Sequence, residues 1–387
     1  MLAGERGAGV SKALELLVAL GDVFGAEKLV PIENAHVSGV SYKNLGDAGV
    51  EWLEDQVKLG DKCKVTTTLN PAGMDLDKWQ EMGVPEDFAE GQVRAIKAFK
   101  ALGIEATCTC TPYLVGNIPR FGSQIAWAES SAVCYSNSVL GARTNRESGP
   151  TTIASAITGL TPLYEYRINQ NRRPGKIVEV EAKLATPLEY SALGYVTGKL
   201  LGSTVPYFRG LGHPNLASLK TLGAACATSG GIALWHGEGV TPEAEEMKSY
   251  LFGLEKITIN EKDLKDAKEK FTCKLQNPIY CIGCPHCSLN EVAEVAKKVN
   301  GRKLKRKLWV FTSRGVYQKA AKRGYIKQIE IAGGCVYVDT CMVVAPLKEI
   351  GWQEVALNSF KGAYYCTNMG ITTEMLTVDQ LVKEALK

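Results

Sequence analysis

Three cysteines of this 387-residue chain share one feature, which is that each stands just past a segment typical of a β-strand. They are Cys110, Cys284 and Cys341. Three thiolates can hold an iron–sulfur cluster and leave one iron open, and such an iron can bind a substrate oxygen as a Lewis acid. The spacing therefore indicates a candidate cluster site.

Two other interpretations of the cysteines stay open at this point. The run from Cys281 to Cys287, which includes Cys284 and His286, has the spacing of half a zinc site. A second ligand pair is missing, because the chain downstream offers only Cys335, Cys341 and Cys366. Cysteines are also common as small buried apolar residues, so the twelve thiols could be structural.

The stretch 104–151 carries further groups that could bind a substrate. Glu129 stands beside the hydroxyls of Ser130 and Ser131, and Arg143 and Arg146 flank an amide. Small and polar residues dominate the stretch, as they do where backbone must approach a ligand. We therefore expect it to form one wall of an active site that grips an anionic substrate.

The histidines and one lysine add to the candidates. His36 and His286 flank the candidate loops. Each could have a catalytic or substrate-binding role, and a structural role stays open for each. His213 and His236 lie in the glycine-rich middle of the chain and are expected to be structural. Lys361 precedes a predicted strand, where it could be a surface lysine or a cation for a substrate phosphate or carboxylate.

The first part of the chain alternates helices and strands. Apolar periodicity predicts helices over 10–25, 47–58, 86–102 and 151–160, and strands over 29–32, 64–68 and 104–109. This alternation is typical of a parallel sheet, whose loops gather at the carboxyl ends of the strands. The loops 36–42, 69–73 and 110–117 are therefore expected to converge on one rim.

The rest of the chain predicts two more α/β units. A strand is expected over 177–181, and close backbone packing over the glycine-rich segments between 192 and 239. Solvated helices are expected over 241–248 and 261–270, and strands over 279–282, 308–311, 336–338 and 363–365. The predicted domains are 1–125 with the substrate loops and the first cluster cysteine, 126–265, and 266–387 with the other two.

Composition narrows the class of protein. The net charge is only +4, and no cluster of Lys and Arg stands beside aromatic residues. The sequence therefore does not indicate nucleic-acid binding. No apolar run reaches the roughly 18 residues of a membrane span. The first seven residues carry an acid and glycines where a signal peptide would have a basic and then an apolar region, so we expect a cytoplasmic protein.

Seven motifs, in order along the chain, resemble the aconitase X family. They are Leu2-x-Gly4-Glu5-x-Gly7, Thr68–Gly73, Cys110–Tyr113, Glu129–Val133, Asn137–Glu147, Gly283–His286 and Asp339–Cys341. The resemblance implies a [4Fe–4S] cluster held by Cys110, Cys284 and Cys341. It implies an aconitase-like fold, a multi-domain α/β/α arrangement with mostly parallel sheets that lacks the swivelling domain. That domain would be supplied by a small subunit, in a heterodimer or a higher assembly.

The resemblance also implies a substrate site and a reaction. Substrate contacts would fall on Gly39, Val40, Ser41, Asn70, Pro71, Glu129, Ser130 and Lys361. The form is that of the separate large subunit found in archaea. This form implies a hydro-lyase that dehydrates (R)-5-phosphomevalonate, a small phosphorylated substrate, to trans-anhydromevalonate 5-phosphate in an archaeal-type mevalonate pathway for isoprenoids.

No catalytic base is evident in the chain. By analogy with aconitase, a serine of the swivelling domain, and hence of the small subunit, would remove the proton. Two alternatives are kept. One is a dehydratase of another hydroxy acid or of hydroxyproline, and the other is a non-enzymatic zinc-binding protein.

Overall fold

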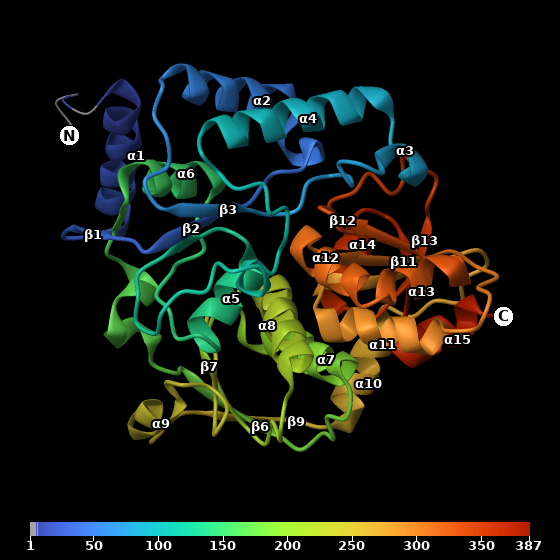
Figure 1. Cartoon of the computed structure of the whole chain (residues 1–387). Helices are drawn as coiled ribbons and strands as arrows, with labels where there is room; N and C mark the ends of the chain where they lie inside the picture. The colour runs from blue at the N-terminus through green and yellow to red at the C-terminus, as the bar shows by residue number, and fades with distance from the viewer. Residues whose placement is uncertain (1–4, 6) are drawn as a thin grey trace.

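The computed structural model describes residue 5 and residues 7–387, so the argument from the first seven residues lies largely outside the described part. Three parallel sheets, each covered by helices, make up most of the fold. In Figure 1 the first sheet lies at the top, the second at the bottom, and the third to the right. The predicted α/β class with mostly parallel sheets is confirmed.

The first sheet has the order β3-β2-β4 and is parallel throughout. Its strands are β2 (Asn34–Val37), β3 (Thr66–Leu69) and β4 (Ala126–Trp127). Helices α2 (Tyr42–Lys58) and α4 (Glu86–Ala101) pack together over it, and α1 (Ala8–Phe24) packs on α6 (Gly149–Thr158) (Figure 1). The helices lie close to the ranges predicted from apolar periodicity, and α1 buries Val10, Leu14 and Leu17 of its apolar face, whereas Val23 is exposed.

One predicted strand lies outside the expected parallel sheet, and another predicted strand is wrong. Strand β1 (Leu29–Pro31) pairs antiparallel with β5 (Leu160–Pro162) in a separate ribbon, so it is outside the parallel sheet. The segment 104–109 forms no strand and touches the sheet through a single bridge between Glu105 and Thr68. The freed backbone turns instead toward the first cysteine of the candidate site, and Cys108 takes a positive φ of 42° in this turn.

The second sheet has the order β8-β7-β6-β9. Its strands are β6 (Lys176–Val180), β7 (Pro206–Arg209), β8 (His236–Gly237) and β9 (Lys256–Ile259). Helices α7 (Pro187–Leu201) and α8 (Leu216–Gly230) pack closely against each other. A Cβ at Gly194 would lie 2.4 Å from the Leu222 carbonyl oxygen, so the predicted close backbone packing is confirmed.

The third sheet has the order β12-β11-β10-β13-β14, all parallel. Its strands are β10 (Ile279–Cys287), β11 (Leu308–Thr312), β12 (Cys335–Val338), β13 (Glu354–Leu357) and β14 (Thr372–Met375). Residues 363–365 were predicted as a strand, and this is wrong because they lie in α14 (Phe360–Asn368). The order reverses beside β10, with β11 and β12 on one side and β13 and β14 on the other.

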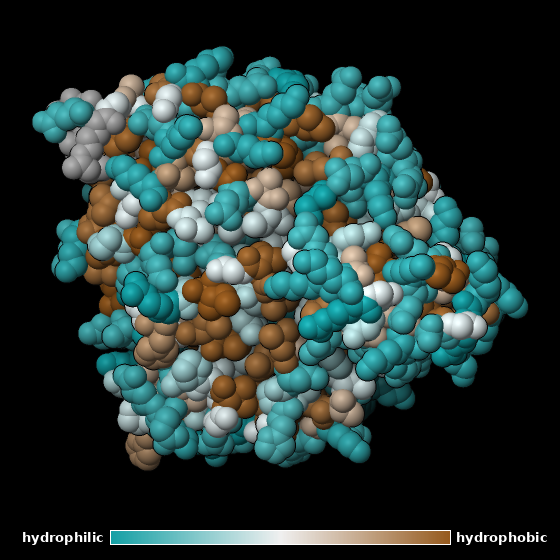
Figure 2. Space-filling model, in the orientation of Figure 1, coloured by the Kyte–Doolittle hydropathy of each residue, from teal (hydrophilic) through white to brown (hydrophobic). Residues whose placement is uncertain are grey.

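The remaining helices are short or cover the third sheet. They are α3 (Trp79–Met82), α5 (Ser130–Ser138), α9 (Ala244–Met247), α10 (Glu261–Lys270), α11 (Leu289–Val299), α12 (Arg314–Lys322), α13 (Tyr325–Ala332) and α15 (Val378–Ala385). Across residues 5 and 7–387, no helix is both long and apolar enough to cross a membrane. Figure 2 shows a mostly hydrophilic face with apolar residues gathered near its centre, in the region where Figure 1 places α5 and α8.

Candidate active site

The carboxyl ends of the first and third sheets face each other. The amide of Ala72, in the loop after β3, donates to the carbonyl of Asp339, just past β12, at 2.7 Å. Ser41, in the loop after β2, donates its hydroxyl to the Val344 carbonyl at 2.9 Å. Loops at the carboxyl ends of parallel strands are where α/β proteins bind ligands. The seam between the two sheets is therefore the candidate active site.

Within the third sheet, the reversal of strand order lies between β10 and β13. Open parallel sheets bind ligands in the crevice at such a point. The strands β10 and β13 lead to Cys284 and Lys361 respectively, so both residues stand at this crevice.

A bulge in β10 directs Cys284 out of the sheet. Ile282 pairs with Val310 and Cys287 with Thr312, so residues 283–286 leave the ladder. Gly283 makes this possible, because it has a φ of 115° and a Cβ there would lie 2.2 Å from the Phe311 carbonyl oxygen.

The three candidate cysteines are brought together at the seam and are buried. Burial raises the pKa of the Cys341 thiol well above its usual range, and nearby Cys284 and Cys110 raise it further. Burial likewise raises the pKa of Cys110 to about 12. The segments that carry them meet at His286, two residues after Cys284, whose amide donates to the Sγ of Cys110 at 3.2 Å and whose Nε2 bonds to the carbonyl of Thr340, the residue before Cys341.

The neighbouring cysteines belong to other parts of the core. Cys108 packs with the apolar residues under α2 and α4, and Cys287 packs with those under α11. Within the described residues, no three His, Cys, Asp or Glu side chains are arranged to surround a single metal ion. Three buried thiols at one place are the type of ligand that iron–sulfur clusters use.

A buried ion pair lies beside the cysteines. The Lys361 ammonium donates to Glu129, and to the Ser131 hydroxyl at 2.5 Å. The Glu129 carboxylate also accepts from the Ala132 amide at 2.6 Å and from Ser131 at 2.7 Å. Burial alone would raise the pKa of Glu129, but the Lys361 ammonium lowers it below its ordinary value. Glu129 is therefore held as a carboxylate and is a poor proton acceptor.

His36 and Asn70 present unused polar atoms to the same region. His36 is fully buried, and its Nδ1 bonds to the Thr68 hydroxyl at 2.8 Å. Its Nε2 and the Oδ1 of Asn70 are buried and make no hydrogen bond of normal geometry, although the Asn70 side chain lies close enough to affect the pKa of the ring. Burial lowers the pKa of His36 to about 4, against raising effects of Glu129 and Asn70. A neutral imidazole and an amide are thus available to a polar ligand.

The other predicted substrate residues line the loops of the first sheet. Gly39 is exposed with a φ of 80°, and Ser41 is the N-cap of α2. The Val40 carbonyl accepts from the Gln92 side chain at 3.0 Å. Pro71 is buried, and Ser130, half-buried, is the first residue of α5.

The expectation that Arg143 grips a substrate is wrong, because Arg143 is buried and pairs with Glu243 at 2.7 Å, which Arg172 also binds. Arg146 is exposed and donates to the carbonyl of Gly231 at 3.3 Å, so its proposed role stays a prediction.

Three histidines differ from His36 in their partners. His236 bonds through Nε2 to the Arg172 carbonyl at 2.8 Å, as expected for a structural residue. His213 is exposed. Both ring nitrogens of His286 are bonded within the protein, to Thr109 and to Thr340, so this histidine holds no free group for a substrate.

Two further residues contact the site. Ser131, whose hydroxyl was named beside Glu129 in the sequence analysis, bridges Lys361 and Glu129. Sequence reasoning gave no role to the second residue. Lys220 is buried and donates to the His286 carbonyl at 2.7 Å and to Glu291 at 2.6 Å. A lysine in a helix of small residues was the only hint for it.

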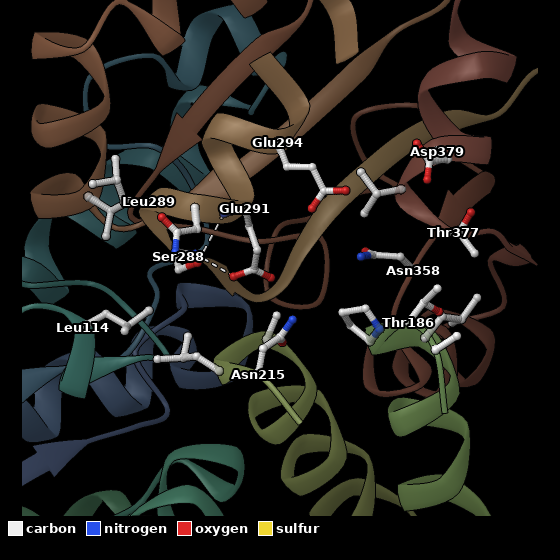
Figure 3. A pocket seen from close by; sticks show the side chains of 18 of the residues that line it. Leu114, Thr186, Asn215, Ser288, Leu289, Glu291, Glu294, Asn358, Thr377 and Asp379 are labelled. Atoms are coloured by element: carbon white, nitrogen blue, oxygen red, sulfur yellow. Dashed lines mark hydrogen bonds between the residues drawn. The ribbon is translucent and has the colours of Figure 1, made fainter. Parts of the chain in front are cut away.

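A cavity of about 560 Å³ opens next to the seam (Figure 3). The N-terminal ends of α7, α8, α11 and α15 border it, with Thr186 and Asn215 on one side and Ser288 on the other. Helix N-termini attract anions, but the carboxylates of Glu291, Glu294 and Asp379 also line this space. All three carboxylates are paired with lysines, Glu291 with Lys220 and the other two with Lys298, and Lys319 also lines the space.

Comparisons with known proteins agree over the whole chain. Family models described as the first, second and third domains of aconitase X match residues 1–170, 174–269 and 278–387. A crystal structure of Thermococcus kodakaraensis aconitase X in its holo form superposes with a TM-score of 0.94 at 46% identity. The match covers 99% of this chain and 97% of that one, and it confirms the predicted aconitase-like fold.

Two curated relatives share the length of this chain. The chain is 50% identical to the phosphomevalonate dehydratase large subunit of Methanothermobacter thermautotrophicus, over 95% of this chain and 92% of that protein. It is 49% identical to the protein of that name from Methanocaldococcus jannaschii, over 94% of this chain and 93% of that protein.

Proposed function

Because the chain belongs to the aconitase X family, we propose that it is the large subunit of a hydro-lyase that dehydrates (R)-5-phosphomevalonate to trans-anhydromevalonate 5-phosphate. The observation that carries this proposal is the near-full-length identity to archaeal subunits of that name. These two relatives do not support either alternative function, which were the dehydration of another hydroxy acid or of hydroxyproline, and non-enzymatic zinc binding.

We propose that Cys110, Cys284 and Cys341 hold a [4Fe–4S] cluster. A bound cluster with one iron free of cysteine would supply a Lewis acid for the leaving hydroxyl of the substrate. The fit of the residues supports this proposal, since the three thiols are buried, near one another and beside a cation. Metal binding would also deprotonate thiols whose pKa burial has raised.

The chain's own residues would bind and orient the substrate. Lys361 supplies a buried cation, and the loop Gly39–Ser41 follows the carboxyl end of β2, where α/β proteins bind ligands. His36 and Asn70 offer the unpaired Nε2 and Oδ1 to polar atoms of the substrate. Pro71, Glu129 and Ser130 complete the proposed contacts. Such fixed orientation supplies much of a barrier reduction.

The proton of C2 would be removed by a residue outside this chain. Glu129 is the carboxylate beside the cysteines, and Lys361 lowers its pKa, so it is ill suited to accept a proton. We therefore propose that a small swivelling-domain subunit supplies the base in a cytoplasmic heterodimer or higher assembly. The division at residues 125 and 265 stays a prediction, although β4 and α6 pack with the first sheet.

The test is anaerobic turnover of (R)-5-phosphomevalonate after cluster reconstitution, with and without the small subunit. We expect water loss only in the complex, abolished by Cys110→Ala, Cys284→Ala or Cys341→Ala. Cys273→Ala is the matched control, because Cys273 is an exposed thiol away from the seam. Turnover by the large subunit alone would refute the borrowed base. A cluster-loaded complex inert to this substrate would redirect the proposal to other hydroxy acids.

A further inference from the structure

One residue connects all three cysteine-bearing segments. The amide of His286 donates to the Sγ of Cys110 at 3.2 Å, and its Nδ1 bonds to the hydroxyl of Thr109 at 3.0 Å. Its Nε2 bonds to the carbonyl of Thr340, the residue before Cys341, at 2.8 Å. His286 itself lies two residues after Cys284, in the bulge of β10.

The fourth polar group of His286 reaches the second domain. Its carbonyl accepts from the buried ammonium of Lys220, on α8, at 2.7 Å. Every hydrogen-bonding group of this residue is therefore used, and each partner comes from a segment at least 54 positions away in sequence. The side chain is fully buried, so water does not compete for these bonds.

The acceptor chemistry determines the tautomer of the ring. The Thr340 carbonyl can only accept, so Nε2 carries the hydrogen, and in the neutral ring Nδ1 accepts from the Thr109 hydroxyl. Thr109 in turn accepts from the Thr111 amide at 3.2 Å. The ring therefore has one orientation in which all of these donors and acceptors are satisfied.

From this geometry we infer that His286 is a positioning residue that holds the segments of Cys110, Cys284 and Cys341 in register for the cluster before the cluster is present. The inference rests on the proposed cluster ligands. It predicts that loss of the imidazole ring makes the cysteine segments of the cluster-free chain more mobile. It also predicts that the assembled cluster site becomes less stable. It assigns His286 no contact with the substrate.

Three variants separate this role from a general loss of stability. His286→Ala removes both ring bonds, whereas His286→Gln keeps an N–H donor at about the reach of Nε2. The control is His236→Ala, which also removes a buried histidine with one carbonyl partner but lies in the second sheet.

The first measurement uses the cluster-free chain, under conditions where circular dichroism shows it folded. We expect iodoacetamide to label Cys110 and Cys341 faster in His286→Ala than in the wild type, with His286→Gln between them. His236→Ala should match the wild type at these thiols. Equal labelling in His286→Ala and His236→Ala would overturn the inference.

The second measurement follows iron and acid-labile sulfide after anaerobic reconstitution. Loss of a residue that orients ligands lowers metal retention by about tenfold or more, so His286→Ala should lose its cluster to a chelator that much faster. Its reduced cluster should also give an altered electron paramagnetic resonance signal. Retention and spectrum like those of His236→Ala would count against the inference. A wild-type chain that takes up no cluster would refute the proposed cofactor, and the labelling result would still decide the role of His286.

Discussion

At the residue scale, the site depends on charges that are matched in pairs. Lys361 and Glu129 are both buried, and the charge of each side chain is balanced mainly by the charge of the other. Burial opposes the charged form of Lys361, but Glu129 raises its pKa above the ordinary value. A cation can therefore persist in a low-dielectric pocket beside three thiols.

This pairing predicts an asymmetric mutational cost. Lys361→Met should destabilise the cluster-free chain by about 3–5 kcal/mol, because it leaves the Glu129 carboxylate buried without a counter-charge. The double variant Glu129→Gln with Lys361→Met should recover part of that loss. Midpoints of chemical denaturation for the wild type, both single variants and the double variant measure the effect. A double variant no more stable than Lys361→Met would contradict the pairing.

The chemical types at the site could be predicted from sequence better than their partners. Cysteines after strand-like segments gave the cluster candidates, because the parallel-sheet rule places loops at one edge. The role of Arg143 could not be predicted, since Glu243 reaches it only through the fold. The binding of His286 to Thr109 and Thr340 is equally non-local.

At the element scale, the bulge of β10 places Cys284 and His286 where the strand order of the third sheet reverses. A regular strand would keep alternating side chains in the sheet, whereas residues 283–286 leave the ladder and carry Cys284 and His286 into the seam. The positive φ of Gly283 and its approach to Phe311 leave no space for a side chain.

Gly283→Ala should therefore be more damaging than a positive φ alone explains. Strain at such a φ costs of order 1–3 kcal/mol, and the contact with the Phe311 carbonyl adds to it. Gly301→Ala is the matched control, since Gly301 has a φ of 69° and open space around it. Thermal unfolding of both variants compares the costs. Equal shifts in melting temperature would show that the close approach is unimportant.

Element types were predictable where local pattern and burial agree. The apolar periodicity of 86–102 predicted α4, and apolar runs predicted β11 and β12. The segment 363–365 carries aromatic residues that favour strands, but Ser359 caps a helix there and α14 packs against α8. Strand β2 was missed because its residues, Asn34–Val37, are buried yet partly polar.

At the scale of the whole molecule, the active site is a seam that hydrogen bonds hold closed. Asp75 lies on the first-domain side and is buried. Its carboxylate accepts from the amides of Asp77 and Lys78, both at 3.0 Å, and from the amide of Val338 in β12 at 2.9 Å. The segment leading to Cys341 is thus fastened to the loop that carries the proposed substrate residues.

Asp75→Ala should loosen this seam. It leaves three amides without their acceptor, at about 1–3 kcal/mol for each one that stays buried and unpaired. Asp55→Ala is the control, because Asp55 and its partner Lys58 are both exposed and such a pair contributes little to stability. We expect limited proteolysis to cut Asp75→Ala faster near the seam. A cleavage pattern like that of Asp55→Ala would contradict this role of Asp75.

The wide spacing of the three cysteines along the chain has a consequence for biosynthesis. Cys110 leaves the ribosome long before Cys341, and Lys361 follows later still. The central strand β10 also cannot acquire its neighbour β13 until residues 354–357 have been made. The thiol pocket therefore comes into being only after residue 361 has been made. A cofactor could be inserted only once all of the segments from Cys110 to Lys361 have been synthesised.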